Sequence, residues 1–233
     1  MFTKQNSLGI FGIDAYTICV EADVSDGQNA FNIVGLPDAA VRESGDRVRS
    51  AMLNNGFIFP TGHTTINLAP ADRKKEGTLY DVPILIALLV STGQLFGDFS
   101  ETAFIGELSL DGELRAINGL LPMAIEARQS GIKHLYVPKE NAAEGAVVKD
   151  INIYPVENIS MLVKALKGEE IIAPAEYIPD DEFEDNKSWF MDKTAQMWKE
   201  KRELYVEELS NRLNATLQSL SQTFSKDNEC FNY

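Results

Sequence analysis

Residues 68–89 have the sequence LAPADRKKEGTLYDVPILIALL, and this stretch decides the fold that the chain is expected to adopt. It begins at the end of a strand-like alternation of apolar and polar residues at 64–69. It then crosses a charged loop at 71–77 and enters an apolar run at 82–90. A helix with so little polar surface needs cover on both sides. We therefore predict a buried central helix with the charged loop at its N-terminal end.

The segments around this stretch alternate between strand and helix patterns. Strands are predicted at 8–24, 31–36, 103–108, 114–117, 135–137 and 153–156, and helices at 39–54, 119–130, 139–146 and 160–166. The turn residues 25–28 predict a hairpin between the first two strands. Asp38 is expected to cap the helix that follows, and Asn55-Gly56 to end it. The order predicts an α/β fold with a mixed sheet (α+β), not a uniform series of βαβ units.

Composition divides the 233 residues into three predicted parts. Residues 1–168 carry the strand and helix patterns and form the predicted domain. Residues 169–186 contain eight acidic residues and no basic one, and they are predicted to be an acidic linker. Residues 187–233 are predicted to be a helical extension with a frayed end, because no Gly or Pro occurs between 187 and 224. Apolar residues three and four apart fit either self-association through 187–225 or packing on the chain's own domain.

The net charge of −14 argues against a protein that coats nucleic acid along its whole surface. The two cysteines, Cys19 and Cys230, have no metal-binding spacing and fit a reducing compartment, and Cys19 is expected to be a buried thiol. No run of residues is apolar and long enough to suggest a signal peptide or a membrane span. We therefore expect a cytoplasmic protein that does not contact a membrane.

Local clusters of basic residues leave room for a small phosphate-binding surface. The candidate contacts are Arg47, Arg49, Arg73, Lys74, Lys75 and Arg115. Contacts of this kind would be sensitive to salt and indifferent to base sequence. The alternative is that the arginines of the helix at 39–54 pair with neighbouring acidic residues and simply face solvent, which is the commoner role of surface charge.

Seven stretches of the chain follow one another in a recognisable order. They are GIDAY (12–16), FNIVGLPD (31–38), VRESGDRVRSAMLNNGF (41–57), INLAPAD (66–72), GELSLDGELR (106–115), GLLPMAIEAR (119–128) and VPKENAAE (137–144). Together they resemble the N-terminal domain of the magnesium-chelatase-like proteins of the ComM/YifB type. The resemblance covers nearly all of residues 8–168. It implies the fold of the Lon protease C-terminal domain, which also occurs at the C-terminus of the RadA recombination protein.

The resemblance also implies a place in DNA processing and competence. Members of this family normally continue into an AAA+ ATPase module. The chain contains no G-x-x-x-x-G-K-[ST] sequence, so it lacks a P-loop of its own. ATP and magnesium are therefore expected only together with such a module, and no cofactor or metal is expected on this chain. His63 and His134 are isolated and do not suggest a metal site.

Lon-type peptidases use a serine nucleophile that a lysine activates. By the resemblance, the serine position falls on Leu79 and the lysine position on Leu121. An aliphatic side chain can neither attack a carbonyl group nor accept a proton. Thr78 is a conceivable displaced nucleophile, but no base is implied beside it. No catalytic residue is therefore predicted.

Three functional hypotheses follow. The first is a non-catalytic, Lon-like accessory domain of a ComM-like AAA+ system that processes DNA, with a role in DNA contact, subunit assembly or both. The second is a module for protein interaction or oligomerisation that does not bind DNA. The third, and least favoured, is a residual peptidase. The expected partners are DNA, AAA+ subunits, or a second copy bound through residues 187–225.

Overall fold

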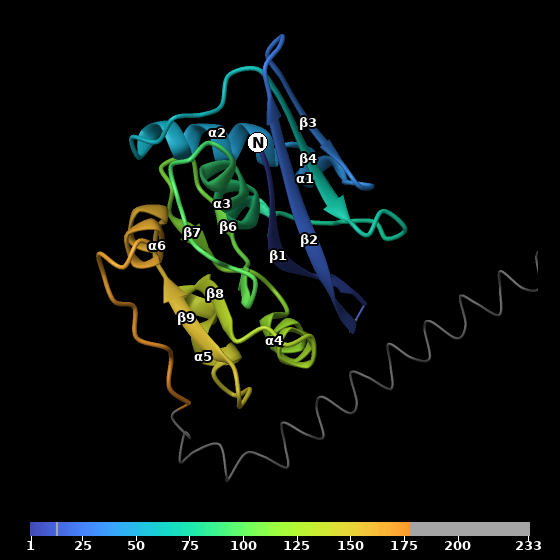
Figure 1. Ribbon diagram of the computed structural model, residues 1–233. Helices are drawn as coiled ribbons and strands as arrows, with labels where there is room; N and C mark the ends of the chain where they lie inside the picture. Colours follow the sequence, from blue (N-terminus) through green and yellow to red (C-terminus); the bar gives the residue numbers. More distant parts are fainter. Residues whose placement is uncertain (13, 178–233) are drawn as a thin grey trace, which may run out of the picture. The chain divides into compact units, whose positions relative to one another are not determined.

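The computed structural model describes residues 1–12 and 14–177 (Figure 1). A seven-stranded sheet has the order β3-β4-β2-β1-β5-β8-β9. Its strands are β1 (Phe2–Phe11), β2 (Asp14–Ser25), β3 (Ala30–Val34), β4 (His63–Ala69), β5 (Thr102–Phe104), β8 (His134–Pro138) and β9 (Asn152–Val156). A separate hairpin joins β6 (Glu107–Leu108) to β7 (Leu114–Arg115). Antiparallel and parallel pairs occur in the same sheet, so the predicted mixed α/β fold is confirmed.

Helices cover both faces of this sheet. They are α1 (Ala39–Arg42), α2 (Ser44–Asn54), α3 (Asp81–Ser91), α4 (Leu120–Gln129), α5 (Ala142–Gly145) and α6 (Ile159–Leu166), with the 3-10 turn η1 (Lys139–Asn141) before α5. Apolar residues of α2, α3 and α6 form one core cluster with one face of the sheet. Apolar residues of α4 and α5 form a second cluster on the other face. The sheet therefore lies between two apolar layers.

The central helix is buried as the sequence predicts. Ten of the eleven residues of α3 are buried, and only Val90 is partly exposed. α3 packs against β1, β2 and α2. Pro83 lies in the first turn of the helix, where a missing N–H group costs no hydrogen bond. Gly93, with a φ of 69°, follows the C-terminal end.

The predicted hairpin between 8–24 and 31–36 is wrong in two respects. The first segment is two strands, because the chain turns at Gly12 and β1 pairs with β2 along its whole length. β3 does not pair with β2 but lies parallel to β4. The reason is that β2 already has β1 on one side and β4 on the other, so it has no free edge for β3.

The predicted helix at 39–54 is divided at Glu43 into α1 and α2. Its predicted ends are confirmed. The Asp38 carboxylate accepts a 2.8 Å hydrogen bond from the backbone N–H of Val41, and Gly56, with a φ of 76°, follows the last turn. The predicted helix at 139–146 is η1 followed by α5. Cys19, expected to be buried, is half-buried.

The first part of the predicted acidic linker runs beside the sheet. The backbone N–H of Ala175 donates to the carbonyl of Ile153 at 2.7 Å, and Ile172 is buried. Residues 178–186 of the predicted linker, and the predicted extension at 187–233, lie outside the described residues.

Gly35 offers a test of how closely β3 and β4 approach. Its φ is +98°, and an added Cβ would lie 2.2 Å from the carbonyl oxygen of Leu68. Gly131 also has a positive φ, of +83°, but an added Cβ there meets nothing within 4 Å. We expect Gly131→Ala to cost about 1 kcal/mol from backbone strain. Gly35→Ala should cost roughly 1–3 kcal/mol more, because the clash adds to that strain. Urea unfolding of both variants measures the difference, and equal costs would contradict the close approach.

Candidate functional site

An ion pair lies at the start of α3 between the fully buried Asp81 and Arg47, whose side chain is 17% exposed. Asp81 is 0% exposed, and its carboxylate accepts hydrogen bonds from Nε of Arg47 at 2.7 Å and from Nη2 at 3.0 Å. The backbone N–H of Leu108 donates to the same carboxylate at 3.1 Å. Arg47 also donates to the carbonyl of Ala40 and to Oγ of Ser44. The two-point contact between guanidinium and carboxylate fixes α2 against the N-terminus of α3.

Burial raises the pKa of the Asp81 carboxyl above its ordinary value, and the hydrogen bonds from Arg47, Ser44 and Leu108 oppose that rise. The hydrogen bond to Asp81 raises the pKa of the Arg47 guanidinium, against the effect of its own burial. The guanidinium therefore keeps its proton, and the carboxylate inside the core has a fixed counter-charge. This arrangement corrects the expected position of Arg47. Its side chain is directed mainly inward, with 17% exposed and a longer 3.8 Å contact to the neighbouring Glu43, so it is not a solvent-facing phosphate contact.

The charged loop between β4 and α3 is organised around Lys75. This residue is 0% exposed, and its ammonium group donates to the carbonyl of Arg73 at 2.8 Å and to that of Pro70. Burial lowers the pKa of Lys75. Its backbone N–H donates to the carbonyl of Leu36, and its carbonyl accepts from the N–H of Asp38. Lys75 holds the loop together from inside. The sequence suggested a solvent-facing cation at this position, and the structure shows that this expectation is wrong.

Two further side chains anchor this loop to the sheet and to α1. The second oxygen of the Asp38 carboxylate accepts a 3.1 Å hydrogen bond from the N–H of Gly77. The Tyr16 hydroxyl donates to the carbonyl of Lys74 at 3.2 Å. Tyr16 is also hydrogen-bonded to Tyr80, and burial raises the pKa of the Tyr80 phenol. The loop is therefore fixed at several points and presents a defined surface.

The remaining candidate cations face solvent in different settings. Lys74 pairs with Glu76 at 2.8 Å, and Arg115 pairs with Glu107 at 3.4 Å. The guanidinium group of Arg73 lies 4.8 Å from the centre of the Tyr16 ring. Arg49 similarly lies 5.4 Å from the Phe59 ring. Glu107 also accepts a hydrogen bond from the Thr78 hydroxyl, which brings β6 and β7 beside the loop.

The two positions at which the resemblance places a peptidase dyad have separate structural roles. Leu79 is half-buried and packs against both apolar clusters, and its carbonyl accepts a 3.0 Å hydrogen bond from the N–H of Gly106. Leu121 lies in the first turn of α4, is 36% exposed, and donates its backbone N–H to the Glu144 carboxylate at 2.8 Å. Neither side chain can supply a nucleophile or a base.

The sequence does not predict which buried side chains pair with one another at this site. Asp81 carries a weak signal, because an acidic residue in the first turn of an apolar helix needs a buried partner. Nothing local identifies that partner as Arg47, which lies on another helix.

Over residues 1–12 and 14–177, no group of three or more His, Cys, Asp or Glu side chains could hold a metal ion. His134 is hydrogen-bonded to the Tyr154 hydroxyl at 3.1 Å.

The family model for "Subunit ChlI of Mg-chelatase" matches residues 20–141, which is more than half of the chain. The chain belongs to this family. The match includes α2, the charged loop and α3, so the ChlI-family region contains the Arg47–Asp81 pair and Lys75.

Curated proteins confirm the predicted resemblance of this ChlI-family chain. Competence protein ComM of Haemophilus influenzae is 40% identical over 160 residues, which are 68% of this chain and 31% of ComM. YifB of Escherichia coli is 40% identical over 162 residues, 69% of this chain and 32% of YifB. A Lon protease of Chloroflexus aurantiacus is 28% identical over 156 residues, 61% of this chain and 18% of the protease. The chain thus spans about a third of the length of ComM and YifB.

Similarity to a Lon protease is consistent with the predicted Lon-like fold of the ChlI-family domain. Among the helices of the described residues, none is both long and apolar enough to cross a membrane. The predicted cytoplasmic location stays a prediction.

The buried pair predicts a large effect of removing one partner. Asp81→Ala removes the buried partner of Arg47 and, among the described residues, leaves its guanidinium with only the exposed Glu43 carboxylate at 3.8 Å, so we expect it to lower the free energy of unfolding by about 3 kcal/mol. Replacing Arg47 and Asp81 together with Met and Leu should cost less, since no unpaired charge remains. The matched control is Glu101→Ala, which breaks the exposed Lys133–Glu101 pair and should cost about 1 kcal/mol or less. Equal costs of Asp81→Ala and Glu101→Ala in urea unfolding would contradict this account.

Proposed function

We propose that this chain acts as a non-catalytic accessory component of a ComM-like AAA+ system that processes DNA. In this role its Lon-like domain contacts DNA, helps AAA+ subunits to assemble, or does both. One observation carries the proposal. The domain keeps a Lon-like scaffold, but the two positions of the expected dyad carry Leu79 and Leu121. The ComM relative is named a competence protein, which supports the connection with DNA processing that the resemblance implies.

The loop between β4 and α3 is the proposed DNA contact. Lys75, Asp38 and Tyr16 hold its backbone from inside, so Arg73 and Lys74 project from a fixed support. Arg115 lies close by through Glu107 and Thr78. A rigid support lowers the entropy lost when these side chains engage a phosphate. Lys74 and Arg115 already have carboxylate partners, so the proposed binding is weak and depends on salt.

The AAA+ partner would supply the chemistry that this domain lacks. ATP and magnesium would be bound by the AAA+ module, in a longer form of the chain or on a separate subunit. The described domain would contribute a stable surface, and no step of ATP hydrolysis is assigned to its residues.

DNA binding is tested by fluorescence anisotropy of labelled single-stranded and forked DNA with the full chain. We expect binding at low salt that weakens strongly near physiological salt. Charge reversal of Arg73 and Lys74 together to Glu should weaken it at least about tenfold, since two phosphate contacts become repulsive. Lys75 is left unchanged because its role is internal.

The control for the DNA measurement is Lys133→Glu, which reverses an exposed charge on another part of the domain. This variant should bind DNA within about twofold of the unaltered chain, because its change in net charge acts only at long range. If it weakens binding as much as the loop variant does, the loop is not the contact. Absence of binding at low salt would remove DNA contact from the proposal.

A second candidate function is a protein-interaction module that does not bind DNA. Single large apolar side chains are exposed on the described surface, including Phe11 at 71%, Phe96 at 76% and Ile58 at 70%, and an assembly could cover them. Covering such side chains with another surface removes apolar area from water, which is favourable. Under this hypothesis the domain assembles with copies of itself or with other subunits.

The oligomeric state separates the two ways in which the chain could assemble. We expect the full chain to form a defined oligomer in light-scattering measurements of mass. If residues 187–225 drive assembly, a chain ending at Tyr177 should be a monomer. If that shortened chain keeps the same number of subunits, the described domain is the assembling part. A monomeric full chain at all concentrations would contradict the self-association hypothesis.

A further inference from the structure

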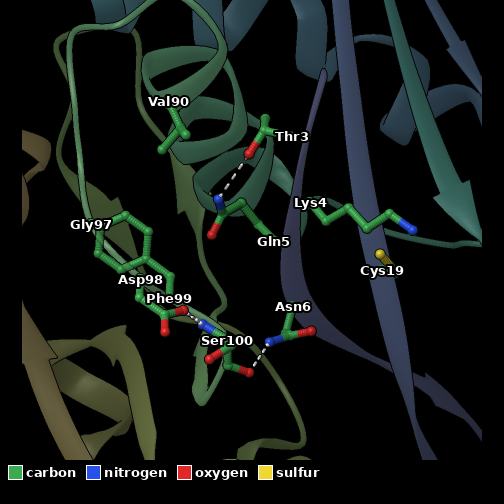
Figure 2. Close-up of a pocket in the computed structure, with 10 residues that line it drawn as sticks. All are labelled: Thr3, Lys4, Gln5, Asn6, Cys19, Val90, Gly97, Asp98, Phe99 and Ser100. Atoms are coloured by element: carbon green, nitrogen blue, oxygen red, sulfur yellow. Dashed lines mark hydrogen bonds between the residues drawn. The ribbon is translucent and has the colours of Figure 1, made fainter. Parts of the chain in front are cut away.

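The edge of β1 is only partly covered by its neighbour in the sheet. β1 pairs with β2 along ten residues, but its pairing with β5 is confined to Asn6 and Ala103. Before Asn6, this edge faces the connection from α3 to β5 at residues 97–100. A hollow of about 360 Å³ lies between them (Figure 2). Its volume is within the range of small-molecule sites, roughly 300–1,000 Å³.

A buried amide reaches this hollow from β1. Gln5 is 4% exposed, and its amide nitrogen donates to the Thr3 hydroxyl at 3.4 Å. Within the described residues, the amide oxygen of Gln5 has no hydrogen-bond partner. Figure 2 shows the Gln5 amide directed toward the space beside Val90 and Phe99. A buried acceptor without a donor is costly, so this position favours a ligand that donates a hydrogen bond.

Of the other polar groups at the hollow, the Asp98 carboxylate also favours a ligand that donates. The Asp98 carboxylate is exposed at its rim and accepts a 3.0 Å hydrogen bond from the N–H of Ser100. That hydrogen bond lowers the pKa of Asp98, which keeps it negatively charged. The amide nitrogen of Asn6 already donates to the carbonyls of Ser100 and Thr102. The ammonium group of Lys4 pairs with Glu21 at 3.2 Å, and Figure 2 shows its side chain directed away from Gln5.

Apolar side chains complete the walls. Val90 comes from the last part of α3, and Phe99 comes from the connection to β5. The Phe99 ring packs edge-on against Phe104, with 6.1 Å between the ring centres. It also lies against the backbone of Gly97, where an added Cβ would be 2.7 Å from the ring. An aromatic face held in this way can stack against a flat cation.

We propose that this hollow binds a flat cation with several N–H donors, a guanidinium or amidinium group carried on an apolar stem. One N–H would donate to the amide oxygen of Gln5, and another to the carboxylate of Asp98. The plane of the cation would lie along Phe99. A guanidinium group fits because it offers five donors in one plane and is weakly hydrated. The proposal does not depend on DNA binding.

A guanidinium or amidinium group at the hollow could come from two sources. A free small molecule would present only the cation and its stem. An arginine side chain of a partner protein would present the cation together with a peptide backbone. Two probes distinguish them, namely methylguanidine and the blocked amino acid N-acetyl-arginine methylamide. If the blocked arginine binds at least about tenfold more tightly, the backbone contributes and the ligand is a partner side chain. Similar affinities assign the hollow to a small molecule.

Binding is measured by titrating the isotopically labelled full chain with each probe and following its amide NMR signals. We expect saturable shifts at Gln5, Asp98 and their neighbours with both cations, and none with acetate, which is flat but accepts hydrogen bonds. Gln5→Leu removes the acceptor and should weaken binding about tenfold, as expected for a lost hydrogen bond to a charged group. Gln5→Glu keeps an oxygen in place and should retain binding.

The exposed rim supplies a variant that leaves the core untouched. Asp98→Asn keeps the acceptor for Ser100 but removes the charge, and it should weaken binding about fivefold. Its matched control is Asp26→Asn, an exposed aspartate in the turn between β2 and β3, which should leave binding unchanged. Saturable binding of acetate, equal binding to the Gln5→Leu and unaltered chains, or no shifts with either cation would overturn the proposal.

Discussion

The pairing of Asp81 with Arg47 is the contact on which the centre of this domain depends. Ten of the eleven residues of α3 are buried, and the Asp81 side chain in its first turn is 0% exposed, so its carboxylate has no access to water. An unpaired carboxylate in that place would be far too costly to keep. The guanidinium of α2 and an N–H group of β6 supply its hydrogen bonds. One side chain thus sets the positions of two helices and a hairpin.

The loop before α3 is supported in a similar way by Lys75. Adjacent lysines have opposite roles there, because Lys74 faces solvent while Lys75 donates its hydrogen bonds to carbonyl oxygens inside the loop. The fixed loop carries the exposed charges of Lys74 and Arg73. If this surface binds phosphate, the buried lysine contributes by holding the loop and not by touching the ligand.

The likeness to a Lon protease supports the fold, and the two positions at which the resemblance places a catalytic pair carry leucines. Leu79 takes part in both apolar layers, and Leu121 lies on the surface of α4. The scaffold therefore has no need of a catalytic pair for its packing. The surfaces of the domain then become the places to look for function. The loop before α3 and the hollow beside Gln5 are two such places with distinct chemistry, since the first offers cations and the second offers acceptors.

The sequence by itself determined the buried central helix, the cap at Asp38 and the mixed α/β class. These features follow from the spacing of apolar residues and from turn and cap chemistry, which act over a few neighbouring positions. It also identified Arg73 and Lys74 as exposed cations, because a charged loop without a periodic apolar pattern is expected to face solvent. Only the tertiary structure decided that Asp81 pairs with Arg47, that Lys75 is internal, that β3 lies beside β4, and that Gln5 faces a hollow. Each of these depends on which distant segments meet, and no local pattern carries that information.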